Sequence, residues 1–227
     1  GPIVDLDFVN ISDTTVPDRS GQANDGVGRK GAVGFETSWS PSTAPDSEGC
    51  WELGEPELSL KLEEPFTPST HDDSFQCFVL PGASPAPRYV RAIDFRPQAR
   101  SLVHHILAYV DTSGRAEELD AADPLPGYSC FGGPKFPPAA ILGAWFPGAS
   151  PLVLPEDTSI VVPENGRIVL QVHYHPHHGR SSADRTEMAV YLDSAARATA
   201  FEYLLAENRS FTIPAGNPAF RVRARYD

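Results

Sequence analysis

Proline and glycine interrupt this chain so often that no long amphipathic helix fits it. The 23 prolines and 18 glycines are spread over all 227 residues. Between them, the apolar residues do not recur with the period of a helix over any long stretch. The pattern therefore predicts many short strands joined by turns.

Short runs with strand character follow one another from residue 51 onward. Leu58, Leu60 and Leu62 alternate with polar residues, which is typical of a half-buried strand. The other runs lie at 75–80, 89–95, 102–110, 141–146, 159–162, 168–175, 187–192, 199–204, 210–213 and 219–224. So many short strands with turns between them predict an all-β fold, an antiparallel β-sandwich that is jelly-roll-like.

The first part of the chain differs from the rest. Residues 1–50 are polar and rich in Gly, Ser, Thr, Asp and Pro, so we expect a loop-rich N-terminal arm. Gly1-Pro2 matches the pair left behind by a protease-cleaved tag, and no signal peptide is visible. Residues 51–227 are expected to form one β-sandwich domain.

The net charge argues against a nucleic-acid partner, and the hydropathy argues against a membrane span. The formal net charge is −12, whereas a protein that binds nucleic acid needs a basic surface for the phosphates. No apolar run approaches the length of a membrane span. We therefore expect neither a nucleic-acid partner nor a membrane span in this chain.

Two of the predicted strands carry histidine where a buried strand normally carries valine or leucine. His104 and His105 are adjacent in one strand, and His173 lies in a later one. Neutral imidazole is the commonest protein ligand of transition metals. We predict that the three histidines bind one copper ion, although three imidazoles also suit zinc. The alternative is three buried histidines that only make hydrogen bonds.

The adjacent pair poses a geometric problem, because neighbours on a regular strand point to opposite faces of the sheet. A local bulge or twist would let both rings reach one ion. Coordination through Nδ1 of one ring and Nε2 of the other is a second solution.

Other side chains near the trio are weaker candidates. Gln171 lies two residues before His173 on the same face and is predicted to support a ligand by a hydrogen bond. His175 also shares that face, but an exposed histidine is favoured over a fourth ligand. Met188, the only methionine, is favoured as core filler over an axial copper ligand. His177 and His178 follow in a polar loop and are expected to be solvated.

Three cysteines, Cys50, Cys77 and Cys130, allow at most one internal disulfide. They show no CxxC spacing of a zinc site. An exported protein would favour the disulfide and a cytosolic protein three reduced thiols. The residues alone leave this choice open.

Three segments carry a resemblance to a known family. They are 95–107 (FRPQARSLVHHIL), 144–155 (AWFPGASPLVLP) and 169–174 (VLQVHY). In composition, order and spacing they resemble the amino-terminal catalytic domain of the copper type II, ascorbate-dependent monooxygenases. This family includes peptidylglycine α-hydroxylating monooxygenase and dopamine β-monooxygenase. The likeness spans about residues 51–227, and the opening at Trp51 (WELGEP) looks more like bacterial relatives than animal enzymes.

The resemblance implies a specific role for the trio. His104, His105 and His173 would hold the electron-transfer copper, which receives an electron from ascorbate or another reductant. The electron would pass to a second copper, where O₂ and substrate react, in a carboxy-terminal domain expected to follow this chain. By itself the chain is then expected to be inactive in C–H hydroxylation.

The resemblance also bears on the cysteines and on location. Cys77 and Cys130 match positions where family members carry a disulfide, which implies an extracellular or periplasmic protein.

Two alternatives to this function stay open: a non-catalytic copper-binding electron-transfer module, and a metal-free β-sandwich that serves as an interaction domain.

Overall fold

The computed structural model describes residues 51–175 and 182–201, with short segments at 3–6, 14–16, 26–28, 210–212, 215–216 and 221–225. The chain divides into two compact units. One consists of Gly1–Pro41 and Tyr203–Asp227, and the other of Ser42–Glu202. The boundary predicted between residues 50 and 51 stays a prediction.

The first unit contains two antiparallel strand pairs among its described residues. β1 (Ile3–Leu6) pairs with β15 (Val222–Arg225), so segments near the two ends of the chain are neighbours. β2 (Thr14–Val16) pairs with β3 (Gly26–Gly28). The strand predicted at 219–224 overlaps β15.

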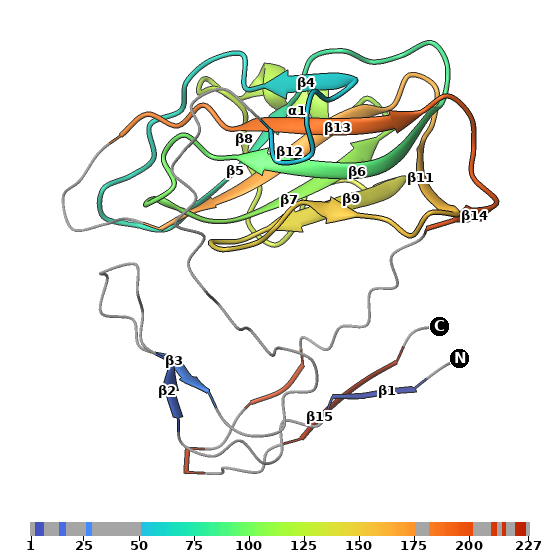
Figure 1. Ribbon diagram of the computed structural model, residues 1–227. Coiled ribbons are helices and arrows are strands. Elements are labelled where there is room, and N and C mark those ends of the chain that lie inside the picture. The colour runs from blue at the N-terminus through green and yellow to red at the C-terminus, as the bar shows by residue number, and fades with distance from the viewer. Residues whose placement is uncertain are drawn as a thin grey trace. The chain divides into compact units, whose positions relative to one another are not determined.

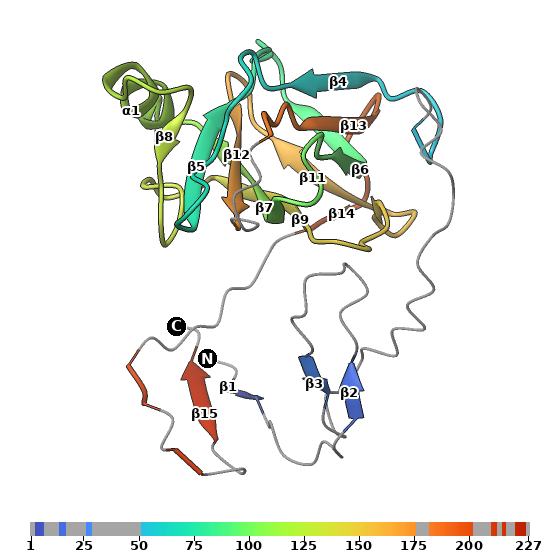
Figure 2. The same cartoon turned by 90° about the vertical axis from the view of Figure 1, so that its left-hand side faces the viewer.

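The second unit consists of two sheets (Figures 1 and 2). The first sheet has the strand order β14-β11-β6-β13-β4, with β10 beside β6. Its strands are β4 (Leu58–Lys61), β6 (Arg88–Arg96), β10 (Leu152–Val153), β11 (Thr158–Val162), β13 (Glu187–Asp193) and β14 (Thr199–Ala200). The second sheet has the order β8-β5-β12-β7-β9. Its strands are β5 (Ser74–Val79), β7 (Val103–Asp111), β8 (Tyr128–Ser129), β9 (Ala140–Trp145) and β12 (Arg167–Tyr174).

Antiparallel pairing dominates both sheets. Among the described strands only β11 and β14 run parallel. The prediction of an all-β, antiparallel β-sandwich is confirmed. Its jelly-roll order stays a prediction.

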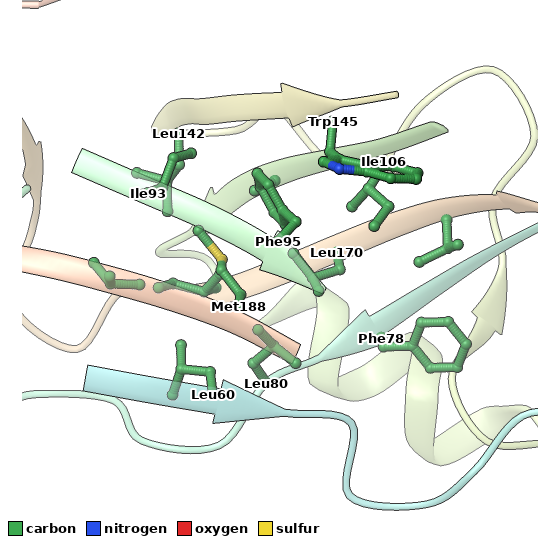
Figure 3. Packing of buried hydrophobic residues seen from close by; sticks show 14 of the residues in the cluster. Leu60, Phe78, Leu80, Ile93, Phe95, Ile106, Leu142, Trp145, Leu170 and Met188 are labelled. Atoms are coloured by element: carbon green, nitrogen blue, oxygen red, sulfur yellow. The ribbon is translucent and has the colours of Figure 1, made fainter. Parts of the chain in front are cut away.

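The main core contains apolar residues from both sheets (Figure 3). Alternate residues of β12 point into it, namely Ile168, Leu170 and Val172, because side chains on a strand alternate between its two faces. Phe95 and Met188 of the first sheet belong to the same cluster. Each such side chain contributes about 1.5–3 kcal/mol when it is fully buried.

The opposite face of the second sheet is covered by the long connection between β7 and β9. Val169 and Tyr109, from β12 and β7, pack there against Tyr128, Cys130 and Phe136 of the connection. Figure 2 shows the helix α1 (Arg115–Ala122) and β8 on this side of β5 and β12, away from β4 and β13. The connection therefore forms a second, smaller apolar cluster on the outer face.

A disulfide between Cys77 and Cys130 ties this connection to β5, as the resemblance implies. The two Cα atoms are 5.8 Å apart and the bridge closes a separation of 53 residues. A loop of this length corresponds to a stabilisation of about 4 kcal/mol through restriction of the unfolded chain. Cys50 lies outside the described residues.

Helix α1 is an element that the strand pattern does not predict. The Asp111 carboxylate accepts hydrogen bonds from the backbone N–H groups of Ser113 at 2.7 Å and Ala116 at 2.8 Å. The N–H of Ala116 lies in the first turn of the helix, where backbone donors have no partner within the helix, so the carboxylate satisfies one of them. Within the described part of the chain, no helix has the length and apolar character needed to cross a membrane.

Candidate metal centre

The pairing of β7 with β12 places His105 directly opposite His173. Their neighbours Ile106 and Val172 belong to the core between the sheets. Side chains alternate along a strand, so the two histidines lie on the outer face of the second sheet. The candidate site is therefore on the same face as the disulfide and the covering connection.

The pairing is irregular at this point. Tyr174, the residue after His173, pairs with Val103 and not with His104. His104 is thus an additional residue in β7, which makes a β-bulge. Bulges bend and twist a strand and re-aim side chains, often beside functional sites. A bulge is one of the two arrangements predicted to let adjacent histidines share an ion.

The three rings come close enough to hold a metal ion. One nitrogen from each of His104, His105 and His173 lies within 4.8 Å of the other two. The Nδ1 atoms of His104 and His105 are 3.1 Å apart. Two nitrogens bound to one ion at about 2.0–2.1 Å lie about 3–4 Å from each other. The structure therefore brings together Nδ1 of both adjacent rings, not Nδ1 of one and Nε2 of the other.

The ring of His173 is held in a defined plane. It stacks on Phe75 of β5, with ring centroids 4.0 Å apart and an angle of 8° between the planes. His173 is 8% exposed, and its Nδ1 is buried without a hydrogen-bond partner. Such a buried, unpaired polar atom costs about 1–3 kcal/mol. A metal ion bound by the trio would give this nitrogen a partner.

Asp73, immediately before β5, is a residue of the site that the sequence analysis does not single out. Its Oδ2 lies 2.9 Å from Nε2 of His173, and its Oδ1 lies 2.8 Å from Nδ1 of His175. The carboxylate thus bridges two histidines. No spacing signal marks it, because its position follows from the pairing of β5 with β12, in which Phe75 lies opposite His173.

The surroundings favour the neutral forms of His104 and His105. Burial, and then the nearby rings of His173 and His104, lower the pKa of His105 to about 4. Burial, followed by His173 and His175, also lowers the pKa of His104. Burial raises the pKa of Asp73, but hydrogen bonds from His173 and His175 outweigh this and the net shift is downward. His104 and His105 are therefore free of competing protons near pH 7, which a metal ligand requires.

Metal-free protein is expected to lose stability as the pH falls from about 6.5 to about 4. In this range the unfolded chain protonates His105 while the folded chain, with its lowered pKa, does not. Protonation therefore favours the unfolded state, and the loss is complete below the folded pKa. Urea unfolding in the presence of EDTA measures this loss. Between pH 6.5 and pH 4 the free energy of unfolding of wild type is expected to fall by about 1–2 kcal/mol more than that of His105→Gln, a figure reduced for solvent screening of the half-buried ring. Parallel stability curves for the two proteins would contradict the expectation.

The structure assigns distinct places to the remaining candidates. Gln171 donates from Nε2 to the carbonyl oxygen of Cys130 at 2.7 Å, so it anchors the disulfide-bearing connection. The side chain of His175 is 44% exposed and is bound to Asp73. Met188 is fully buried in the core between the sheets, whereas His105 and His173 lie on the outer face of the second sheet. His177 and His178 lie outside the described residues.

No family model and no curated protein matches this chain. The site must therefore be judged on its own chemistry. It offers three imidazoles and no thiolate, a donor set suited to copper or zinc. The Nδ1 of His173, which has no hydrogen-bond partner, and the neighbouring Nδ1 atoms of His104 and His105 fit such an ion.

Proposed function

We propose that this chain is the copper-binding electron-transfer domain of a copper-dependent monooxygenase-like protein. The observation that carries the proposal is the convergence of His104, His105 and His173 from two paired strands, with a bulge at His104. The motifs FRPQARSLVHHIL and VLQVHY, which resemble the copper type II monooxygenases, contain these three residues.

The properties of the side chains favour electron transfer over hydrolysis. A catalytic zinc site keeps an open coordination position, and zinc proteases of the H-E-x-x-H type add a carboxylate that acts as a general base. The carboxylate beside this trio, Asp73, is engaged by two histidines. Copper bound here would supply a one-electron carrier. The exposed ring of His104 leaves the site accessible to a small reductant such as ascorbate.

In the full-length protein, we propose that the electron reaches a second copper in another domain, where O₂ hydroxylates a C–H bond. Within the described residues the trio is the one group found with metal-binding geometry. The Cys77–Cys130 disulfide supports an exported protein, since such bridges persist in oxidising compartments.

A copper titration followed by EPR tests the proposal. We expect one Cu(II) per chain, nitrogen hyperfine structure in the spectrum, and loss of the Cu(II) signal when ascorbate is added. Stoichiometric zinc with no copper preference in a competition assay would contradict the assignment. So would a copper signal that disappears in the His177→Ala/His178→Ala double variant.

A further inference from the structure

A carboxylate lies beside one nitrogen of His173: Oδ2 of Asp73 is 2.9 Å from Nε2 of the ring. A carboxylate accepts hydrogen bonds and does not donate them. When the His173 ring is neutral, its hydrogen therefore lies on Nε2, and Nδ1 keeps its lone pair. That Nδ1 is the buried atom without a partner.

The orientation of His173 is thus fixed in two ways. Stacking on Phe75 at 4.0 Å sets the plane of the ring, and the hydrogen bond to Asp73 sets its rotation within that plane. The ring cannot turn over without losing the hydrogen bond to Asp73. Phe75 and Asp73 lie close together at the start of β5, so one short segment controls the ring.

We propose that Asp73 is a positioning residue of the copper site, which orients His173 and strengthens its Nδ1 as a ligand. This inference rests on the proposed function. A carboxylate that accepts the N–H of a ligand histidine fixes the tautomer and raises the electron density on the nitrogen that binds the metal. The effect favours Cu(II) more than Cu(I), because the more highly charged ion gains more from a stronger donor and a nearby negative charge.

Asp73 acts through His173 and not as a ligand itself. Both of its oxygens are occupied, Oδ2 by His173 and Oδ1 by His175. The contact to His175 holds the carboxylate in place from the other side. The side chain of His175 is 44% exposed, compared with 10% for His173, so the link to His173 is the better shielded from water.

Asp73→Asn tests this role, because it removes the charge and keeps the size of the side chain. Affinities for Cu(II) and Cu(I) are measured by chelator competition on the full chain, for wild type and variant. We expect Asp73→Asn to weaken Cu(II) binding by about 10–100-fold and Cu(I) binding by less, so that the midpoint potential rises. Asp72→Asn is the matched control: it makes the same change at the neighbouring exposed position and is expected to leave both affinities within about twofold.

Three results would overturn the inference. One is Cu(II) binding by Asp73→Asn that equals wild type. Another is an equal loss for both oxidation states together with a lower unfolding temperature of the metal-free variant, which indicates a purely structural role. The third is a loss of Cu(II) affinity in His175→Ala as large as that in Asp73→Asn, which would show that the carboxylate acts on the site by way of His175. Failure of wild type to bind copper is a different result, because it refutes the proposed function itself.

Discussion

Copper affinity is expected to fall by about 100-fold or more when His173 is replaced by alanine. Removal of a residue that only supports a ligand costs 10–100-fold, and removal of the ligand costs at least as much. His173 is also the most buried of the three histidines, so water cannot easily take its place. Copper titration with chelator competition measures the change, and the nitrogen hyperfine pattern in the EPR spectrum is expected to alter with it.

His71→Ala is the control for this experiment. His71 is another histidine, exposed in the loop before β5, and its removal is expected to change copper affinity by less than about twofold. Unfolding of both metal-free variants shows whether they are still folded. Unchanged copper binding in a folded His173→Ala protein would remove this residue from the site, and the proposed function with it.

Replacement of Asp184 by alanine is expected to lower the free energy of unfolding by about 3–4 kcal/mol. Asp184 is fully buried, and its carboxylate accepts hydrogen bonds from three parts of the larger unit. They are the backbone N–H of Ala99 at 2.8 Å, the hydroxyl of Tyr174 at 3.0 Å and the hydroxyl of Thr186 at 2.6 Å. Alanine would leave these buried donors without an acceptor, which is the costly way to lose a hydrogen bond.

Urea denaturation of the metal-free proteins measures this loss. Glu156→Ala removes a carboxylate from an exposed position and is expected to change stability by less than about 0.5 kcal/mol. A loss below about 1 kcal/mol in Asp184→Ala would show that water or relaxation of the chain satisfies the donors. In the sequence Asp184 lies among polar residues, and this pattern does not predict a buried hydrogen-bond acceptor.

Most strands of the sandwich can be predicted from residue types and their spacing along the chain. The apolar, β-branched run at 168–175 predicts a strand, whose side chains alternate between two faces. In the structure β12 has Leu170 in the core and His173 on the outer face. Helix α1 escapes the pattern because it has only eight residues, of which Ala116 alone is buried. Its start depends on the Asp111 carboxylate more than on an apolar stripe.

The candidate site also has a part that the sequence predicts and a part that it does not. Histidines in apolar strands stand out from the sequence, since burial of such a ring needs a partner. Gln171 is placed correctly on the face of His173 by periodicity, but its amide reaches Cys130. Periodicity gives the face of a strand; it does not give the residue that the next strand or loop presents to that face.

The sequence by itself determined the fold class, the three histidines that could share an ion, and a family resemblance that implied the disulfide. These follow from residue types and from spacing along one strand. Only the tertiary structure decided how the adjacent histidines meet and that Asp73 lies within hydrogen-bond distance of His173. The bulge at His104 exists only in the register between β7 and β12. Asp73 reaches His173 because β5 pairs with β12, across 100 residues of chain. Contacts between such distant segments depend on the packing of the whole domain, which local preferences of the chain do not encode.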